Sequence, residues 1–207
     1  MLEILMIRHG KTAGNLKKRY IGRTDEPLCR EGILELQHKW QSYPEVVFSS
    51  PLRRCLETAE ILWPDLPVTV VDDFRECDFG EFENKNYKEL TGNLKYQAWI
   101  DSNGTMPFPG GESLEVFKER VQRQFQGILD HSIKAGYRSI ALAVHGGTIM
   151  SIMDRWGIPP GEYYRWQVKN GEGFMLQVEE NGKTIKIEHT VDLRISLCYD
   201  DARVKKS

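Results

Sequence analysis

The sequence lacks the features that mark several common protein classes. Its four cysteines, among 207 residues, are widely scattered and form no CxxC pair, so neither a zinc site nor a disulfide framework is indicated. No apolar run approaches the roughly 20 residues of a membrane-spanning helix, and no basic stretch followed by an apolar one resembles a secretory signal. The net charge of −2 gives no basic surface of the kind that binds nucleic acid. We expect a cytoplasmic protein with no membrane or nucleic-acid partner.

Several catalytic motifs are missing as well. Neither GxGxxG nor GxxxxGK[ST] occurs, which disfavours a dinucleotide-binding or P-loop enzyme. HxH and HExxH are also absent, and arginines close to the candidate ligands would repel a divalent cation. A metal-dependent hydrolase is therefore the weaker alternative, and we expect no metal and no cofactor.

Two of the five histidines follow apolar, strand-like stretches. Residues 2–7 lead into an arginine and then His9, and residues 139–144 lead into His145. Each histidine is followed by glycine. Open α/β sheets bind their ligands at the carboxyl ends of the strands. The repeated pattern predicts that His9 and His145 share one site.

The remaining periodicity is typical of an α/β fold. It predicts helices at 30–40, 50–62, 113–134 and 148–156, and strands at 46–49, 68–71, 173–178 and 184–188. Ser50 and Pro51 have the types expected at the cap and first position of a helix. Asn181-Gly182 predicts a hairpin between the last two strands. The less regular stretch 73–112 is interpreted as a lid over the sheet edge.

The charged residues suggest a chemistry. Arg53 and Arg54 fall in the first turn of a predicted helix, where the positive end of the helix dipole disfavours cations. They indicate either an anion site or a solvated face. Arginine forks suit phosphate oxygens, a neutral histidine is a competent nucleophile toward phosphorus, and a nearby carboxylic acid can protonate the departing oxygen. Together these groups predict phosphoryl transfer through a phosphohistidine.

Six segments, in this order, resemble motifs of the histidine phosphatase superfamily, also called the phosphoglycerate mutase-like family. They are RHGKT with Asn15, GRTDEPLCREG, SSPLRRCLETAE, FRECDFGEFE, PGGES and VHGG. Their number and order make chance agreement implausible. The resemblance implies a three-layer α/β/α sandwich with a mostly parallel central sheet.

The resemblance also implies roles for single residues. His9 would be the phosphorylated nucleophile, Glu76 the proton donor that later activates water, and His145 a charged group that binds phosphate. The implied phosphate pocket is completed by Arg8, Asn15, Arg54 and the backbone N–H of Gly146. Weaker implied contacts to the leaving group are Arg23 and Glu83. The departures from the family's usual residues, none at a core catalytic position, are Lys11, Cys29, Cys55, Phe82 and Asn84.

Within the family, the short chain, the GRTDEPL segment and the aromatic residues before PGGES resemble the α-ribazole phosphatases of cobalamin synthesis. The resemblance implies one domain over residues 1–207, with 73–112 as the lid that sets specificity. Its partner would be a small phosphorylated metabolite, α-ribazole 5′-phosphate. A broad-specificity phosphatase, a phosphoglycerate mutase-like enzyme and a non-catalytic phospho-ligand module are the alternatives. The sequence leaves a homodimer open.

Overall fold

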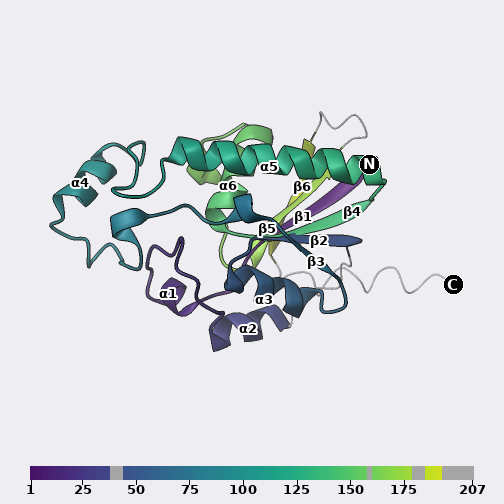
Figure 1. Ribbon diagram of the computed structural model, residues 1–207, viewed down its shortest axis with the longest axis horizontal. Coiled ribbons are helices and arrows are strands. Elements are labelled where there is room, and N and C mark those ends of the chain that lie inside the picture. Colours follow the sequence, from purple (N-terminus) through teal and green to yellow (C-terminus); the bar gives the residue numbers. More distant parts are fainter. Residues whose placement is uncertain (38–43, 158–159, 179–184, 193–207) are drawn as a thin grey trace.

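A computed structural model of the chain describes residues 1–37, 44–157, 160–178 and 185–192, and it contains a six-stranded sheet in the order β3-β2-β4-β1-β5-β6 (Figure 1). The parallel part consists of β1 (Leu2–Arg8), β2 (Val46–Ser49), β3 (Val68–Val70) and β4 (Ser139–Val144). The antiparallel pairings are those of β5 (Glu172–Val178) with β1 and with β6 (Ile185–Asp192). The predicted α/β class with a mostly parallel sheet is confirmed.

Helices cover both faces of this sheet. On one face lie α5 (Leu114–Ala135) and α6 (Gly146–Trp156), and on the other lie α2 (Arg30–Gln37) and α3 (Arg53–Leu62) (Figure 1). The strands are apolar on both sides because both sides are buried. In β1, for example, Ile4 and Met6 belong to the core beneath α5, whereas Leu5 and Ile7 belong to the core beside α3. The result is the three-layer sandwich that the resemblance implies.

The start of α3 differs from the prediction. Ser50 does not cap this helix, which begins at Arg53 after an extended Leu52 that provides no side-chain cap. The Ser50 hydroxyl instead accepts from the Leu52 N–H at 3.3 Å and lies 2.7 Å from Nε2 of His145. By contrast, Ser113 caps α5 as expected, accepting from the Val116 N–H. The predicted Asn181-Gly182 hairpin and the predicted helix end near Trp40 lie outside the described residues.

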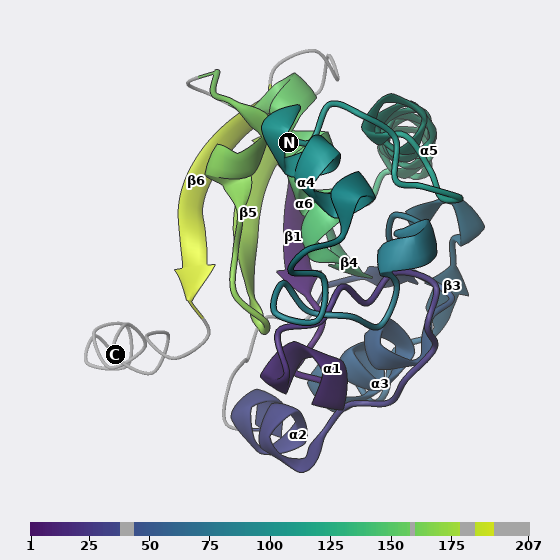
Figure 2. The same cartoon turned by 90° about the vertical axis from the view of Figure 1, so that its left-hand side faces the viewer.

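The segment between β3 and α5 extends beyond the end of the sheet and faces the viewer in Figure 2. Its elements are the short 3₁₀ turns η1 (Asp72–Phe74) and η2 (Gly80–Phe82) and the helix α4 (Leu94–Asp101). Backbone hydrogen bonds from the Tyr20 N–H to the Lys85 carbonyl (2.9 Å) and from the Asn84 N–H to the Tyr20 carbonyl (2.8 Å) attach it to the loop after β1. That loop contains α1 (Ala13–Leu16). None of the helices in the described ranges is both long and apolar enough to cross a membrane.

Candidate active site

Strand pairing brings the two histidines together. β1 and β4 are adjacent and parallel, with Arg8 opposite Val144, so the next residue of each strand is a histidine at the same edge of the sheet. The ring centroids of His9 and His145 are 5.2 Å apart and the rings meet edge to face. Both side chains are buried, His9 being 4% exposed and His145 not at all. The predicted shared location of these histidines is therefore present.

The hydrogen bond of the His9 ring defines its tautomer. Nδ1 lies 2.7 Å from the Gly10 carbonyl oxygen, which can only accept, so Nδ1 carries the proton and Nε2 has the free lone pair. Burial, together with the positive charges of Arg54 and Arg8, lowers the pKa of His9 well below its usual 6.5. A neutral imidazole with an unprotonated Nε2 at neutral pH is the form required of a nucleophile.

The surroundings of His145 bear on the charge that the family resemblance implies for it. Burial lowers its pKa well below 6.5, and the positive charges of Arg54, His9 and Arg8 act in the same direction. These effects favour the neutral form of His145, whose Nε2 lies 2.7 Å from the Ser50 hydroxyl. A phosphate dianion beside the ring would favour the protonated form, so a charge on His145 depends on the anion.

Two arginines lie with the histidines, and each has a donor to spare. The Arg8 Nη1 donates to the Val168 carbonyl at 2.7 Å. Arg54, which is fully buried, donates from Nη1 to the Thr24 carbonyl (2.8 Å) and from Nη2 to the Gly22 carbonyl (2.9 Å). In the part of the chain that is described, Nε of both arginines is buried without a hydrogen-bond partner. Buried N–H groups of this kind are ready donors for phosphate oxygens.

The structure distinguishes Arg54 from its neighbour in sequence. The side chain of Arg53 is 61% exposed and pairs with Glu57 at 2.6 Å on the outside of α3. Arg54 lies one position further around the helix and points inward. The charge of Arg54 contributes to the lowered pKa of both His9 and His145.

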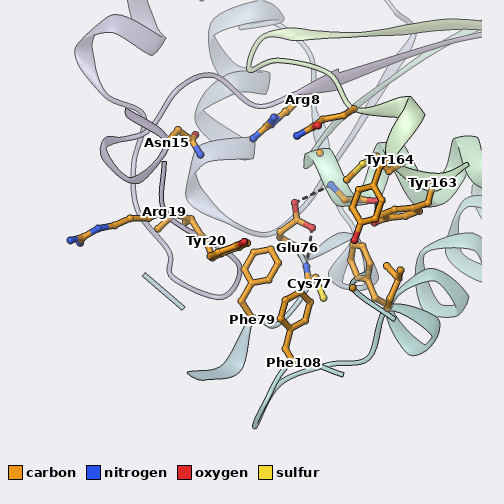
Figure 3. Close-up of a pocket in the computed structure, with 18 of the residues that line it drawn as sticks. Arg8, Asn15, Arg19, Tyr20, Glu76, Cys77, Phe79, Phe108, Tyr163 and Tyr164 are labelled. Carbon is orange, nitrogen blue, oxygen red and sulfur yellow. Dashed lines mark hydrogen bonds between the residues drawn. The ribbon is translucent and has the colours of Figure 1, made fainter. Parts of the chain in front are cut away.

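Asn15 is held with its amide group toward the cavity (Figure 3). Its Oδ1 accepts from the Thr12 N–H (3.2 Å) and from Nδ2 of Asn170 (3.0 Å). Because Oδ1 is engaged, Nδ2 of Asn15 is the group left to donate to a ligand. Asn170 also donates to the His9 carbonyl at 3.1 Å, so it binds both the backbone of His9 and the side chain of Asn15.

The carboxylate of Glu76 enters the same cavity. Its Oε1 accepts from the Cys77 N–H at 2.9 Å and its Oε2 from the Gly147 N–H at 3.1 Å (Figure 3). A Cβ at position 147 would lie 2.3 Å from Oε1, so only glycine allows this approach. Gly146, the first residue of α6, also lines the cavity and packs against the Arg8 guanidinium. The site thus combines an unprotonated imidazole nitrogen, cationic donors and a carboxylate.

Two implied contacts of the leaving group are not brought to this cavity. The Arg23 side chain is 71% exposed and pairs with Asp78 at 3.0 Å on the neighbouring surface. The Glu83 Oε1 accepts from the N–H groups of Gly22 (2.8 Å) and Thr24 (2.9 Å). Glu83, which directly follows the η2 turn, therefore binds the loop around Gly22, to which Arg54 also donates, and its side chain does not reach the cavity. Neither residue lines the cavity.

The outer wall of the cavity is aromatic. The space, about 290 Å³, extends from the histidine end to the segment between β3 and α5 (Figure 3). Tyr20 contacts Phe79 and Trp99 edge to face, and Trp99 stacks on Phe108 with centroids 5.0 Å apart. The aromatic residues that line the space are Tyr20, Phe79, Trp99, Phe108, Phe117, Tyr163 and Tyr164.

A sequence profile of the histidine phosphatase superfamily (branch 1) matches residues 4–189. The chain belongs to this superfamily. It is 26% identical over 222 residues to a 2,3-bisphosphoglycerate-dependent phosphoglycerate mutase of Bifidobacterium longum, with 89% of each chain covered. It is also 26% identical over 196 residues to the adenosylcobalamin/α-ribazole phosphatase of Escherichia coli, covering 90% of this chain and 95% of that one.

A solved structure, the α-ribazole phosphatase of Shigella flexneri, superposes with a TM-score of 0.78 at 24% identity, covering 92% of this chain and 96% of that one. This likeness establishes the histidine phosphatase fold. The relatives above include a mutase and a phosphatase at equal identity, so they identify an enzyme of this superfamily that acts on a small phosphorylated substrate. They do not choose the substrate.

Several residues of this histidine phosphatase site carry no sequence signal strong enough to find them. Tyr163 donates its hydroxyl to the Gly147 carbonyl at 3.3 Å, and burial and the charge of Glu76 raise its pKa well above 10. Tyr164 and Asn170 come from the same late stretch, which reads as an irregular connection after Pro160. Asn170 and the following glycine form a dipeptide typical of turns, which predicts a turn here but no role in the site.

Proposed function

We propose that this chain hydrolyses phosphomonoesters through a phosphohistidine at His9, without a metal ion. The observation that carries the proposal is a cavity lined by Arg8, by His9 with its unprotonated Nε2 and by the Glu76 carboxyl group. The fully buried Arg54 adds its positive charge beside His9, and in the described residues Nε of both arginines has no hydrogen-bond partner. The arginines and Asn15 hold the phosphoryl oxygens and stabilise the charge of the transition state.

The reaction has two steps. In the first, Nε2 of His9 forms a bond to phosphorus, the bond from phosphorus to the ester oxygen breaks, and Glu76 gives its proton to that oxygen. In the second, Glu76 takes a proton from water while the water oxygen bonds to phosphorus and the bond to Nε2 breaks. Inorganic phosphate leaves, and His9 and Glu76 return to their starting states.

We further propose α-ribazole 5′-phosphate as the substrate and, with it, a place in cobalamin synthesis. The aromatic wall supports this choice because a flat heteroaromatic leaving group can stack on such side chains. The relative in Escherichia coli bears the name of that activity. The competing candidate is a phosphoglycerate mutase-like enzyme, favoured by the mutase relatives.

A phosphoglycerate would need a cation for its carboxylate, and the wall offers little for that purpose. The guanidinium of Arg19, although its side chain lines the cavity, points away from it (Figure 3) and binds Glu89 (2.7 Å) and Asn84 (3.2 Å). We propose that residues 73–112 form the specificity-determining lid. Its backbone attachment to Tyr20 makes it a fixed wall more than a moving flap.

The test is phosphate release from α-ribazole 5′-phosphate, 3-phosphoglycerate, sugar phosphates and nucleotides, in EDTA. We expect metal-independent turnover with one strongly preferred substrate, and an acid-labile phosphoryl group on the quenched enzyme. His9→Ala should lose both signals. Activity that EDTA abolishes would refute the metal-independent mechanism. A folded protein that turns over none of these esters would favour a non-catalytic phospho-ligand module.

A further inference from the structure

The segment that bears Glu76 has little regular structure of its own. It lies between η1 and η2, and its internal backbone bonds are those of the η1 turn, such as the Phe74 N–H to the Val71 carbonyl (3.1 Å). Both oxygens of the Glu76 side chain accept backbone N–H groups. The position of this carboxyl group therefore depends on the contacts that bind the backbone carbonyl groups of the same segment.

The guanidinium of Arg120 binds these carbonyl groups. Arg120, in the second turn of α5, donates from Nη1 to the carbonyls of Asp73 (2.6 Å) and Arg75 (2.9 Å), and from Nη2 to the carbonyl of Glu76 itself (3.2 Å). These three carbonyls lie along the stretch that delivers Glu76 to the cavity. A group that binds all three fixes the path of the backbone there.

The remaining edge of the guanidinium is anchored by a carboxylate. Nε and Nη2 of Arg120 bind the two oxygens of Glu112 at 2.8 and 2.9 Å, and both side chains are more than four-fifths buried. The Glu112 N–H in turn donates to the Asp78 carbonyl at 2.9 Å. Arg120 thus connects α5 to both ends of the Glu76 segment.

We propose that Arg120, locked by Glu112, is the positioning residue for the Glu76 proton donor. Only a guanidinium has the planar set of five N–H donors that this arrangement uses. A lysine would keep the charge but could not span three carbonyls and a bidentate carboxylate. This inference rests on the proposed function, in which Glu76 protonates the leaving oxygen.

Loss of this support has a specific kinetic signature. An alkoxide leaving group needs the proton from Glu76, whereas p-nitrophenolate leaves with little protonation. A displaced Glu76 therefore slows alkyl phosphates selectively. A displacement of about 1 Å can lower such a rate by about a hundredfold.

The experiment compares kcat/KM for p-nitrophenyl phosphate and for an alkyl phosphomonoester in the full chain. The variants are Arg120→Lys, Glu112→Gln and Glu76→Gln. The control is Arg123→Lys, on the same helix; the Arg123 side chain is 74% exposed and pairs with the Asp73 carboxylate at 3.4 Å. Circular dichroism establishes that each variant is folded, and Glu112→Gln tests the same support should Arg120→Lys fail to fold.

We expect Arg120→Lys to lower kcat/KM on the alkyl ester by about tenfold to a hundredfold and on p-nitrophenyl phosphate by only a few fold. Glu112→Gln should show the same selectivity, and Arg123→Lys should match the wild type. Equal losses on both esters, or no loss, would overturn the inference while a selective Glu76→Gln variant leaves the proposed function standing. A non-selective Glu76→Gln variant would overturn both.

Discussion

Glu83→Gln tests whether the loop around Gly22 is stabilised from both sides. This loop donates the N–H groups of Gly22 and Thr24 to Glu83, and its carbonyls accept from Arg54. Glutamine keeps the shape of the side chain but removes its charge. The substitution therefore isolates the charge-assisted part of the two hydrogen bonds.

The magnitude follows from the contacts. A hydrogen bond to a charged group contributes about 1 kcal/mol more than a neutral one, so two bonds lose about 2 kcal/mol. The other oxygen, Oε2 of Glu83, is buried and without a hydrogen-bond partner in the described structure, so an amide NH₂ placed there is an unpaired buried donor and adds about 1 kcal/mol. A loss of about 3 kcal/mol lowers Tm by about 6–12 °C in a chain of this size.

The assay is thermal unfolding followed by circular dichroism, with Glu81→Gln as the matched control. Glu81 lies two residues earlier, and its exposed carboxylate pairs with Lys95 at 2.6 Å, so its removal should change stability by no more than about 0.5 kcal/mol. Because the loop also holds Arg54, Glu83→Gln should lower kcat/KM on good and poor leaving groups alike. A Tm equal to that of Glu81→Gln would refute the reasoning.

Three further predictions concern the phosphate end of the cavity. Arg54→Lys keeps a charge but leaves loop carbonyls unpaired, so we expect kcat/KM to fall by about a hundredfold or more, as for a lost oxyanion donor; a silent variant in steady-state assays would contradict the assignment. His9 and His145 have lowered pKa values, so the unfolded chain takes up protons near pH 6.5 before the folded one does, and stability must fall as the pH drops below about 6.5. A urea-unfolding series that shows rising stability there would exclude buried, neutral histidines. Gly147→Ala should misplace Glu76, because the new Cβ would lie 2.3 Å from its Oε1. We therefore expect kcat/KM to fall more for alkyl phosphates than for p-nitrophenyl phosphate, and equal fold losses on the two esters would count against that contact.

Local patterns in the sequence were sufficient to predict most of the strands and helices of the sheet and its flanking layers. The strand at 139–144 and the cap at Ser113 are as predicted because an apolar run and a helix cap depend on neighbouring residues. The predicted start of α3 was two positions too early, because the helix is capped at Leu52 and begins at Arg53. The Ser50 hydroxyl contacts His145, a residue far away in sequence, and this tertiary contact overrides the local preference for a cap.

The site was predicted in part. The pairing of His9 with His145 follows from strand order, which the repeated strand–histidine pattern indicates. The charge expected on His145 stays a prediction for the phosphate-bound site; the lowered pKa of this residue comes from burial and from the charge of Arg54, and neither can be read from spacing. Glu83 was misplaced for a similar reason, since the direction of its side chain is set by a 3₁₀ turn and by distant N–H groups.

The adjacency of β1 and β4 has a consequence for biosynthesis. His9, the proposed nucleophile, directly follows β1, whereas His145 and the Gly147 N–H that binds Glu76 follow β4, more than 130 residues later in the sequence. Contacts of such long sequence separation form late, after the entropy of closing the intervening loop has been overcome. A nascent chain that ends before β4 can contain His9, Arg8 and Arg54 and still have no catalytic centre. If the proposed mechanism holds, phosphoryl transfer requires that the chain be folded at least as far as α6.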